Sequence, residues 1–127
     1  LRAAQPEGAT LLFFDLNDFK GINDNLGHEA GDRCLKHFAD ALRESFRPSD
    51  SFVRYGGDEF VVVAPGLERK LADERVEALR RRIAVSSDLP ELRFSVGISN
   101  LAPGGRPEDA LHAADQLMYE AKTKGAS

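Results

Sequence analysis

The chain has 127 residues, of which 42% are hydrophobic and 30% charged, and these globular values exclude a disordered or fibrous protein. This length predicts one domain, spanning residues 1–127, and is sufficient for a proper hydrophobic core. The net charge of −4 argues against a nonspecific nucleic-acid binder, whereas a nucleotide ligand stays compatible because metal ions can offset local repulsion.

Residues 10–15 form a continuous apolar run that ends in Asp15, which is typical of a central strand buried on both faces. A short helix is expected over residues 19–26, and Gly27 ends it. A longer helix is expected over residues 29–46, because four apolar residues recur there at steps of three and four. These residues are Leu35, Phe38, Leu42 and Phe46.

Two short strands are expected over residues 51–55 and 59–64. Gly56 and Gly57 join them, and paired glycines that tolerate positive φ angles are typical of a hairpin. An amphipathic helix follows, with an apolar stripe that comprises Ala72, Val76, Leu79 and Ile83. We interpret its basic face as solvated. That face carries Arg75, Arg80, Arg81 and Arg82.

A strand over residues 92–99 and a helix that begins at Pro107 complete the chain. The element order is therefore β-α-α-β-β-α-β-α. This order predicts an α+β fold with helices packed on a mostly antiparallel sheet.

Cys34 is the only cysteine, so the chain forms neither an internal disulfide nor a cysteine-based zinc cluster. We expect a cytoplasmic domain, because the sequence has a lone thiol and shows neither a secretory leader nor an apolar run long enough to span a bilayer. The chain starts at Leu1 without methionine, so we expect a piece of a larger protein, whose other parts could include a membrane anchor.

Three acids stand out as candidates for metal chemistry. Asp15 ends a fully apolar strand, where a carboxylate is costly to bury unless it is paired or binds a metal. Asp58 and Glu59 follow the paired glycines of the predicted hairpin, where a ligand can approach the backbone closely. If the hairpin lies beside the first strand, the three carboxylates converge, and magnesium prefers such oxygen ligands. Alternatively, Asp58 and Glu59 are only turn formers at a solvated strand edge.

Several separated motifs resemble the GGDEF family of diguanylate cyclases. The segment 55–60 reads Tyr-Gly-Gly-Asp-Glu-Phe and matches the family signature letter for letter. Further segments match the family in order and spacing: 14–20 (FDLNDFK), 22–24 (IND), 27–32 (GHEAGD), 95–98 (SVGI) and 114–122 (AD, Y, AK). The resemblance implies a palm-like α+β domain, similar to adenylyl cyclases and polymerase palms. It also implies that two GTP molecules are joined into cyclic di-GMP and two pyrophosphates.

The resemblance implies metal and catalytic roles at matching positions. Asp15, the carbonyl of Leu16, Asp58 and Glu59 are expected to bind Mg²⁺, with Mn²⁺ as an alternative cation. Asp58 is also the expected general base for the 3′-hydroxyl, and Glu59 is expected to be the second catalytic residue, as a metal ligand. Regular strand alternation sends Asp58 and Glu59 to opposite faces, so both reach the metal only if the turn breaks it.

The resemblance also implies substrate contacts. Asn23 and Asp32 are expected to read guanine, although a helix cap and a first-turn helix acid are their structural alternatives. Further contacts are expected from His28, from the amides near Phe19 and Lys20, from Lys122 on the triphosphate, and from Gly56 and Gly57, which make room for the nucleotide. Tyr55 and Phe60 are expected to be packing residues.

An Arg-x-x-Asp motif, formed by Arg47 and Asp50, precedes the paired glycines with five residues in between. In the family, this motif at this spacing binds the product and inhibits the enzyme. An arginine fork can engage guanine or phosphate, and an aspartate can accept from the guanine edge.

Two departures from the family pattern bear on activity. The usual Asp-x-Leu-Thr-Gly-Leu-x-Asn-Arg segment before the first strand is missing, which predicts an N-terminally truncated piece. Ala126 occupies the place of a usual arginine four residues after Lys122, so one phosphate contact is expected to be lost.

The implied reaction needs two domains that face each other with two-fold symmetry, so a homodimer and attached sensory or regulatory domains are the expected partners. One alternative is a non-catalytic GGDEF module that binds GTP or cyclic di-GMP. Another is a palm-fold cyclase that makes a mononucleotide. The intact signature favours the diguanylate cyclase.

Overall fold

The structure is a computed structural model that describes residues 8–85 and 88–124. Its elements are β1 (Ala9–Leu16), α1 (Phe19–Leu26), α2 (His28–Ser45), β2 (Ser51–Arg54), β3 (Glu59–Pro65), α3 (Arg69–Ile83), β4 (Phe94–Leu101) and α4 (Pro107–Thr123). The predicted order is confirmed. The clearest boundary difference is at β4, which begins and ends two residues later than expected.

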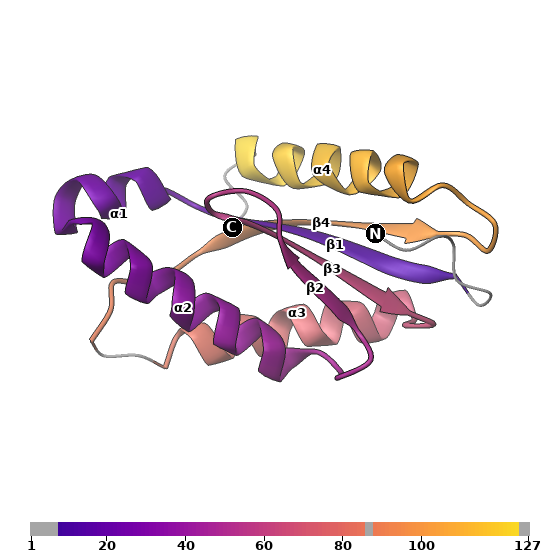
Figure 1. Cartoon of the computed structure of the whole chain (residues 1–127), viewed down its shortest axis with the longest axis horizontal. Helices are drawn as coiled ribbons and strands as arrows, with labels where there is room; N and C mark the ends of the chain where they lie inside the picture. Colours follow the sequence, from indigo (N-terminus) through magenta and orange to yellow (C-terminus); the bar gives the residue numbers. More distant parts are fainter. Residues whose placement is uncertain (1–7, 86–87, 125–127) are drawn as a thin grey trace.

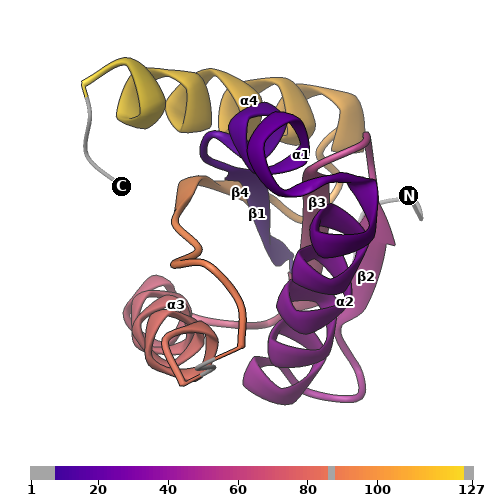
Figure 2. The same ribbon diagram turned by 90° about the vertical axis from the view of Figure 1, so that its left-hand side faces the viewer.

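The four strands form one sheet in the order β2-β3-β1-β4, and every neighbouring pair is antiparallel. Helix α4 lies along one face of this sheet, and α2 and α3 lie on the other (Figure 1). The view from the end of the molecule shows the same three layers (Figure 2). The structure thus has the predicted α+β architecture. No helix in the described ranges is long and apolar enough to cross a membrane.

Strand β1 is the centre of the fold, and all eight of its residues are buried. Because side chains alternate along a strand, β1 contributes to two cores. Leu12 and Phe14 pack toward α2 and α3, whereas Leu11 and Phe13 pack under α4. Asp15 continues the second series, so its carboxylate lies on the α4 face at the end of the strand.

Gly97 allows α4 to approach β4 closely. A Cβ atom built at this position would overlap the carbonyl oxygen of Ala114 and crowd the amide nitrogen of Met118. Both partners are helix backbone, which cannot move aside cheaply. The glycine therefore fixes how deeply α4 sits, and with it the position of Lys122 near the helix end.

The predicted hairpin between β2 and β3 is confirmed, but the expected role of its glycines is wrong. Neither Gly56 nor Gly57 has a positive φ angle. Instead, Gly56 leaves space for the Glu59 side chain, because a Cβ at position 56 would overlap Glu59 Oε1. Arg54 closes the turn by donating to the carbonyls of Gly56 at 3.2 Å and Gly57 at 2.5 Å.

The basic face of α3 is only partly solvated, which corrects the sequence interpretation. Arg75 Nη1 donates to the Ser45 carbonyl at 3.1 Å, and Arg82 Nη1 to Ser45 Oγ at 3.2 Å. The guanidinium of Arg80 stacks 4.4 Å from the centroid of the Phe94 ring. Helix C-termini leave carbonyls without intrahelical partners, which explains why Arg75 reaches the end of α2.

Candidate active site

Asp15 is buried at the end of β1, where the residue is only 6% exposed. Its Oδ2 atom accepts a hydrogen bond from Lys122 Nζ on α4 at 3.0 Å. Its Oδ1 atom is also buried, and within the described part of the chain nothing donates to it. A buried carboxylate oxygen without a donor is costly, so this atom is suited to a bound cation.

Asp58 and Glu59 lie directly beside Asp15. Glu59 begins β3 and is the Cα partner of Asp15 across the antiparallel pair. Asp58 lies in the preceding turn, and its carbonyl accepts from the Leu16 amide at 3.0 Å. The carboxyl of Asp58 is close enough to raise the pKa of both other acids. The turn therefore breaks strand alternation and brings both acids toward Asp15.

Burial and neighbouring acids together raise the pKa of two carboxyls in this cluster. Burial is the main cause that raises the pKa of Asp15, and Asp58 adds to it while Lys122 opposes it. Burial also raises the pKa of Glu59, with additions from Asp15, Asp58 and Asp115 and opposition from Lys122. Additional positive charge would therefore stabilise the ionised cluster.

The donor chemistry of this cluster fits a hard divalent cation. Carboxylate and carbonyl oxygens are available from Asp15, Leu16, Asp58 and Glu59, and magnesium prefers such ligands. Over residues 8–85 and 88–124, no group of three or more acid, histidine or cysteine side chains is arranged so that it could hold a metal ion. Lys122 meanwhile holds one of the two oxygens of Asp15.

Asp115 is a residue of this site that the sequence interpretation missed. It lies on α4 and contributes to the raised pKa of Glu59. Seven residues, or about two helical turns, separate it from Lys122, so both occupy one face of the helix. This spacing was the signal that could have identified it.

The predicted guanine contacts lie on α1 and α2. Asn23 is half-buried, and its side-chain oxygen lies against Gly31, next to Asp32. A pocket of about 340 Å³ opens beside Asp32, with Leu35 and Phe60 among its apolar lining. His28 is the exposed first residue of α2.

The start of α1 carries the predicted phosphate-binding amides at Phe19 and Lys20. Asp18 precedes them in the left-handed region, with a φ of 54°. Its carboxylate lies against Gly21, and therefore beside the first turn of the helix. The Lys20 ammonium pairs with Asp24 at 3.3 Å on the exposed side of the helix.

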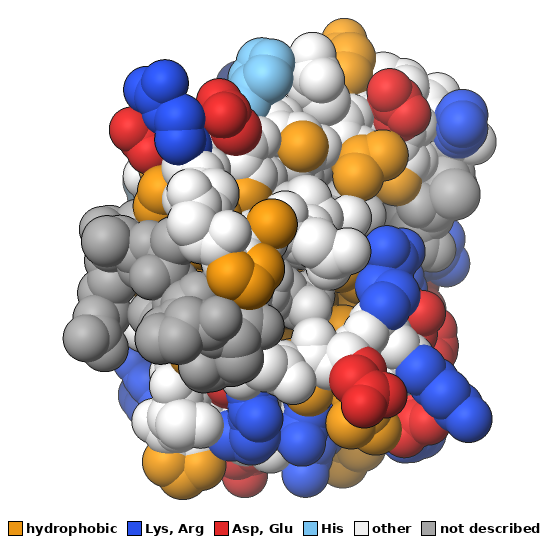
Figure 3. All heavy atoms as spheres, turned by 90° about the vertical axis from the view of Figure 1, so that its right-hand side faces the viewer, with side chains coloured by type: hydrophobic (Ala, Val, Ile, Leu, Met, Phe, Trp, Pro, Cys, Tyr) orange, Lys and Arg blue, Asp and Glu red, His pale blue; other side chains and the backbone are white. Residues whose placement is uncertain are grey.

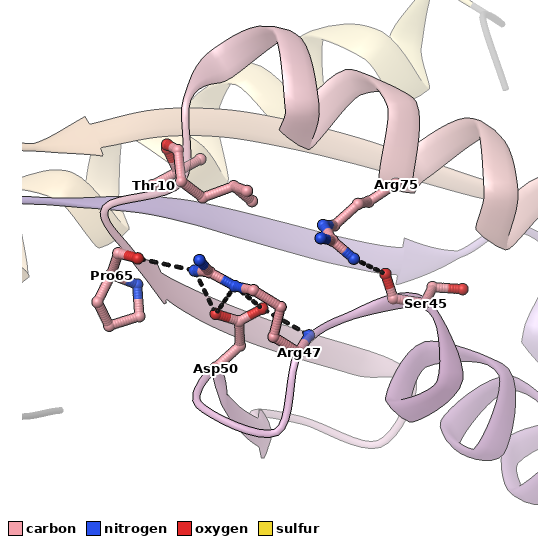
Figure 4. Close-up of polar contacts among 7 residues, drawn as sticks. Thr10, Ser45, Arg47, Asp50, Pro65 and Arg75 are labelled. Carbon is pink, nitrogen blue, oxygen red and sulfur yellow. Dashed lines mark hydrogen bonds and ion pairs between the residues drawn. The ribbon is translucent and has the colours of Figure 1, made fainter.

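Arg47 and Asp50 form a closed pair at the loop between α2 and β2 (Figure 4). Arg47 Nη2 donates to Asp50 Oδ1 at 2.7 Å and to the Pro65 carbonyl at 2.7 Å, while the Arg47 amide donates to Asp50 Oδ2 at 2.8 Å. The Asp50 side chain is 1% exposed. The side-chain hydrogen bond to Asp50 raises the pKa of Arg47 above its usual range. The motif thus ties the loop to the end of β3.

The acid cluster and the Arg47–Asp50 pair lie at opposite ends of the sheet. Pro65 pairs with Ala9 at one end of the β1–β3 ladder, and Glu59 pairs with Asp15 at the other. Six residue steps along β1 lead from one end to the other, which corresponds to about 20 Å. At the end away from the acid cluster, basic and acidic side chains are interspersed rather than gathered by sign (Figure 3).

Phe60 is a packing residue, as predicted, whereas Tyr55 packs with only part of its side chain. Phe60 is buried and packs against the ring of Phe38 at 5.1 Å between centroids. Tyr55 is 56% exposed, but its ring contacts Phe13 edge-on at 5.4 Å. The predicted departure at Ala126 lies outside the described residues.

A family profile described as the GGDEF domain of diguanylate cyclases matches residues 1–127. The diguanylate cyclase DgcP of Pseudomonas aeruginosa is 36% identical over 126 residues, which cover 94% of this chain and 19% of that protein. The response regulator PleD of Caulobacter vibrioides is 39% identical over 124 residues, which cover 90% of this chain and 27% of that protein.

Solved structures show the same fold. The GGDEF domain of DgcB from Caulobacter crescentus, crystallised in complex with c-di-GMP, superposes with a TM-score of 0.84 and 26% identity. The match covers 93% of this chain and 74% of that one. The two curated relatives are much longer, so this chain corresponds to about a fifth to a quarter of their length.

Proposed function

Because this chain belongs to the GGDEF domain family of diguanylate cyclases, we propose that it condenses two GTP molecules into cyclic di-GMP. Each 3′-oxygen attacks the α-phosphorus of the other GTP, and each bond between the α- and β-phosphates breaks. Two pyrophosphates leave, and two 3′-hydroxyl protons pass to bases on the protein.

The observation that carries this proposal is the acid cluster at the end of β1. It combines a buried, partnerless oxygen of Asp15 with two further carboxyls from the β2–β3 hairpin. The structural alternative, in which Asp58 and Glu59 only form a solvated turn, does not account for the buried Oδ1 atom of Asp15, which the ion pair with Lys122 leaves without a partner. Nucleotidyl transfer requires such a cluster.

We assign the metal site to Asp15, the carbonyl of Leu16, Asp58 and Glu59, with Mg²⁺ as the cation and Mn²⁺ as a substitute. When bound, the cation supplies Lewis acidity to the phosphate oxygens and to the attacking hydroxyl. The raised pKa values of Asp15 and Glu59 support this assignment, because burial and then neighbouring carboxyls disfavour the ionised forms, which a cation would stabilise.

Asp58 is the proposed base that accepts the 3′-hydroxyl proton. It is half-buried in the turn, next to the cluster, and the adjacent Gly57 leaves open space in which a substrate can approach. General-base catalysis of this kind contributes about 10²–10⁴-fold to a rate. Gly56 leaves room for the Glu59 side chain, since a Cβ atom at position 56 would overlap Glu59 Oε1.

The guanine base is proposed to lie beside α2. Asp32 can accept from the N1 and N2 hydrogens of guanine, and Asn23 can both donate and accept. The apolar pocket beside Asp32 supports this placement, since Leu35 and Phe60 can contact the flat base. His28 and the amides of Phe19 and Lys20 are further proposed contacts, for which exposure and helix position are the support.

Catalysis is proposed to require two domains related by a two-fold axis. One site binds one GTP, and each hydroxyl must meet the α-phosphate held by the other site. Attached regulatory domains of a longer protein would bring the two copies together. The partial coverage of the relatives by this chain supports such an arrangement.

We further propose that cyclic di-GMP binds at Arg47 and Asp50 and inhibits the enzyme. The support is the position of this pair, about 20 Å along the strands from the acid cluster, where a ligand would not occupy the substrate site. The Asp50 carboxylate is engaged by Arg47, so a ligand that uses both side chains must open the pair.

The test is to incubate the chain, fused to a dimerising coiled coil, with GTP and Mg²⁺ and to identify the product by mass spectrometry. We expect cyclic di-GMP and pyrophosphate from this fusion. The same fusion with Asp58→Asn is the matched control and should make on the order of 10²–10⁴-fold less product. GTP binding without product from a well-folded dimer would instead indicate a regulatory binding module.

A further inference from the structure

The ion pair between Lys122 and Asp15 joins two elements that are 107 residues apart in the chain. The lysine nitrogen lies 3.0 Å from Asp15 Oδ2. The lysine side chain is 42% exposed, whereas the aspartate side chain is 9% exposed. The lysine therefore reaches inward from the solvent side of α4 to a carboxylate that is fixed in the sheet.

The surroundings of this pair are acidic from every side. Asp15 comes from β1, Asp58 and Glu59 come from the β2–β3 hairpin, and Asp115 comes from α4 itself. Lys122 opposes the rise in the pKa of both Asp15 and Glu59, so at least these two carboxyls share its ammonium, which carries a compact charge on a flexible stem. The lysine supplies part of the positive charge that a cation would supply at the same oxygens.

We propose that Lys122 is the built-in counter-ion of the metal-free site and competes with the divalent cation for Asp15. This inference rests on the proposed metal site and deepens it. The ammonium on Asp15 Oδ2 disfavours a cation on the same carboxylate, because two like charges near one carboxylate repel each other. The exposed lysine stem lets the ammonium swing away without a change in the backbone.

A nucleotide changes this competition, because its phosphates offer Lys122 another anion. Once the ammonium contacts a phosphate, Asp15 is free to bind the cation fully. The lysine thereby makes cation binding and nucleotide binding mutually favourable, and linkage requires the coupling to be reciprocal. The site remains partly neutralised when it is empty and binds a cation strongly only together with its substrate.

The experiment measures Mn²⁺ affinity of the 127-residue chain by titration at pH 8 without nucleotide. We compare the wild type with Lys122→Met and with Lys124→Met, a matched control that removes the same charge from the end of the same helix. We expect Lys122→Met to bind Mn²⁺ on the order of tenfold more tightly than the wild type, since one close positive charge is removed. Lys124→Met should stay within about twofold of the wild type, because its charge is exposed and screened.

Two further variants keep the result independent of folding defects. Lys122→Arg retains the positive charge and should bind Mn²⁺ like the wild type, and Lys122→Gln should behave like Lys122→Met. Equal or weaker Mn²⁺ binding by both neutral variants, relative to Lys124→Met, would overturn the proposal.

A second titration adds a saturating non-hydrolysable GTP analogue. We expect the advantage of Lys122→Met to disappear or to reverse, because the wild-type lysine then contacts phosphate. An advantage that persists unchanged would contradict the coupling. The Mn²⁺ titration without nucleotide tests only the competition between Lys122 and the cation. If the dimeric fusion made no cyclic di-GMP, the proposed function would be wrong, but the result of this titration would still hold.

Discussion

Asp15 and Glu59 are Cα partners across the β1–β3 ladder, so two carboxyls lie on the same face of the sheet, directly opposite each other. The pKa of each is raised, first by burial and then by neighbouring acids. Like charges in this arrangement destabilise a sheet. The folded chain thus carries a local cost at this position, which a bound cation would offset.

The first prediction concerns Asp15→Asn and the pH dependence of stability. A raised pKa means that the folded state binds the proton more tightly than the unfolded state does. The stability from Asp15 is therefore fully present below its ordinary pKa of 3.8 and is lost as pH rises through the raised value. We expect Asp15→Asn to remove this loss, so that at pH 8 the free energy of unfolding of the variant exceeds that of the wild type by up to about 1 kcal/mol.

Urea unfolding of both proteins in EDTA at several pH values between 4 and 8 measures this difference. The stability of the variant relative to the wild type should increase as pH rises. When Mg²⁺ replaces EDTA, it should stabilise the wild type but not the variant. A difference in unfolding free energy that stays constant with pH would show that the Asp15 carboxyl is not destabilised by its surroundings.

The second prediction separates catalysis from folding at Asp58. The side chain is half-buried in a turn, where the Asp58 backbone carbonyl accepts a hydrogen bond from the Leu16 amide, and a change of side chain leaves this bond in place. Asp58→Asn should therefore change the free energy of unfolding by less than about 0.5 kcal/mol while lowering the turnover of a dimeric fusion by about 10²–10⁴-fold.

Stopped assays with GTP and Mg²⁺, together with urea unfolding, give both quantities for Asp58→Asn. Full turnover by the variant would remove Asp58 from the role of base. A large loss of stability would mean that the side chain supports the hairpin itself.

The sequence predicted the fold well because each element has a strong local signal. The unbroken apolar run that ends at Asp15 predicted a central strand, and Pro107 correctly marked the start of the last helix. The antiparallel sheet followed from the element order. What the local signals could not give is the exact register, and β4 accordingly lies two residues later than predicted.

The sequence predicted the acids of the candidate site, but it did not predict the ion pair between Asp15 and Lys122. The paired glycines and the strand-ending aspartate identified Asp15, Asp58 and Glu59 as neighbours. The contact between Asp15 and Lys122 depends on how α4 crosses the sheet, which no local pattern encodes. For the same reason, the arginines of α3 were interpreted as solvated, although Arg75 reaches the end of α2.

The third prediction tests whether Gly97 positions α4. A methyl group there would collide with backbone at Ala114, so Gly97→Ala should destabilise the fold by about 1–3 kcal/mol and displace the helix that carries Lys122. Gly57→Ala is the matched control for stability, because a Cβ at position 57 meets nothing within 4 Å.

Urea unfolding of the two glycine variants measures the difference. Unchanged stability in Gly97→Ala would show that α4 can move away from β4 at little cost. In that event, the depth of α4 would not fix the position of Lys122.

The last prediction concerns Arg47. Its removal leaves the Asp50 carboxylate, whose side chain is 1% exposed, without its charged partner. Removing one partner of a buried pair costs about 3 kcal/mol, so Arg47→Ala should destabilise the fold by roughly this amount. Arg47→Lys should recover only part of it, because an ammonium cannot reproduce the two-pronged contact with Asp50 and the Pro65 carbonyl.

Urea unfolding and calorimetric titration with cyclic di-GMP distinguish the structural and ligand-binding roles of Arg47. The double variant Arg47→Ala, Asp50→Ala should be more stable than Arg47→Ala alone, because no unpaired carboxylate remains buried. Lys36→Ala, which breaks an exposed pair with Asp40, is the control and should cost less than about 1 kcal/mol. Both Arg47 variants should bind cyclic di-GMP more weakly than the Lys36 control does. Undiminished binding by a folded double variant would place the product site elsewhere and leave Arg47 as the residue that fastens the α2–β2 loop to β3.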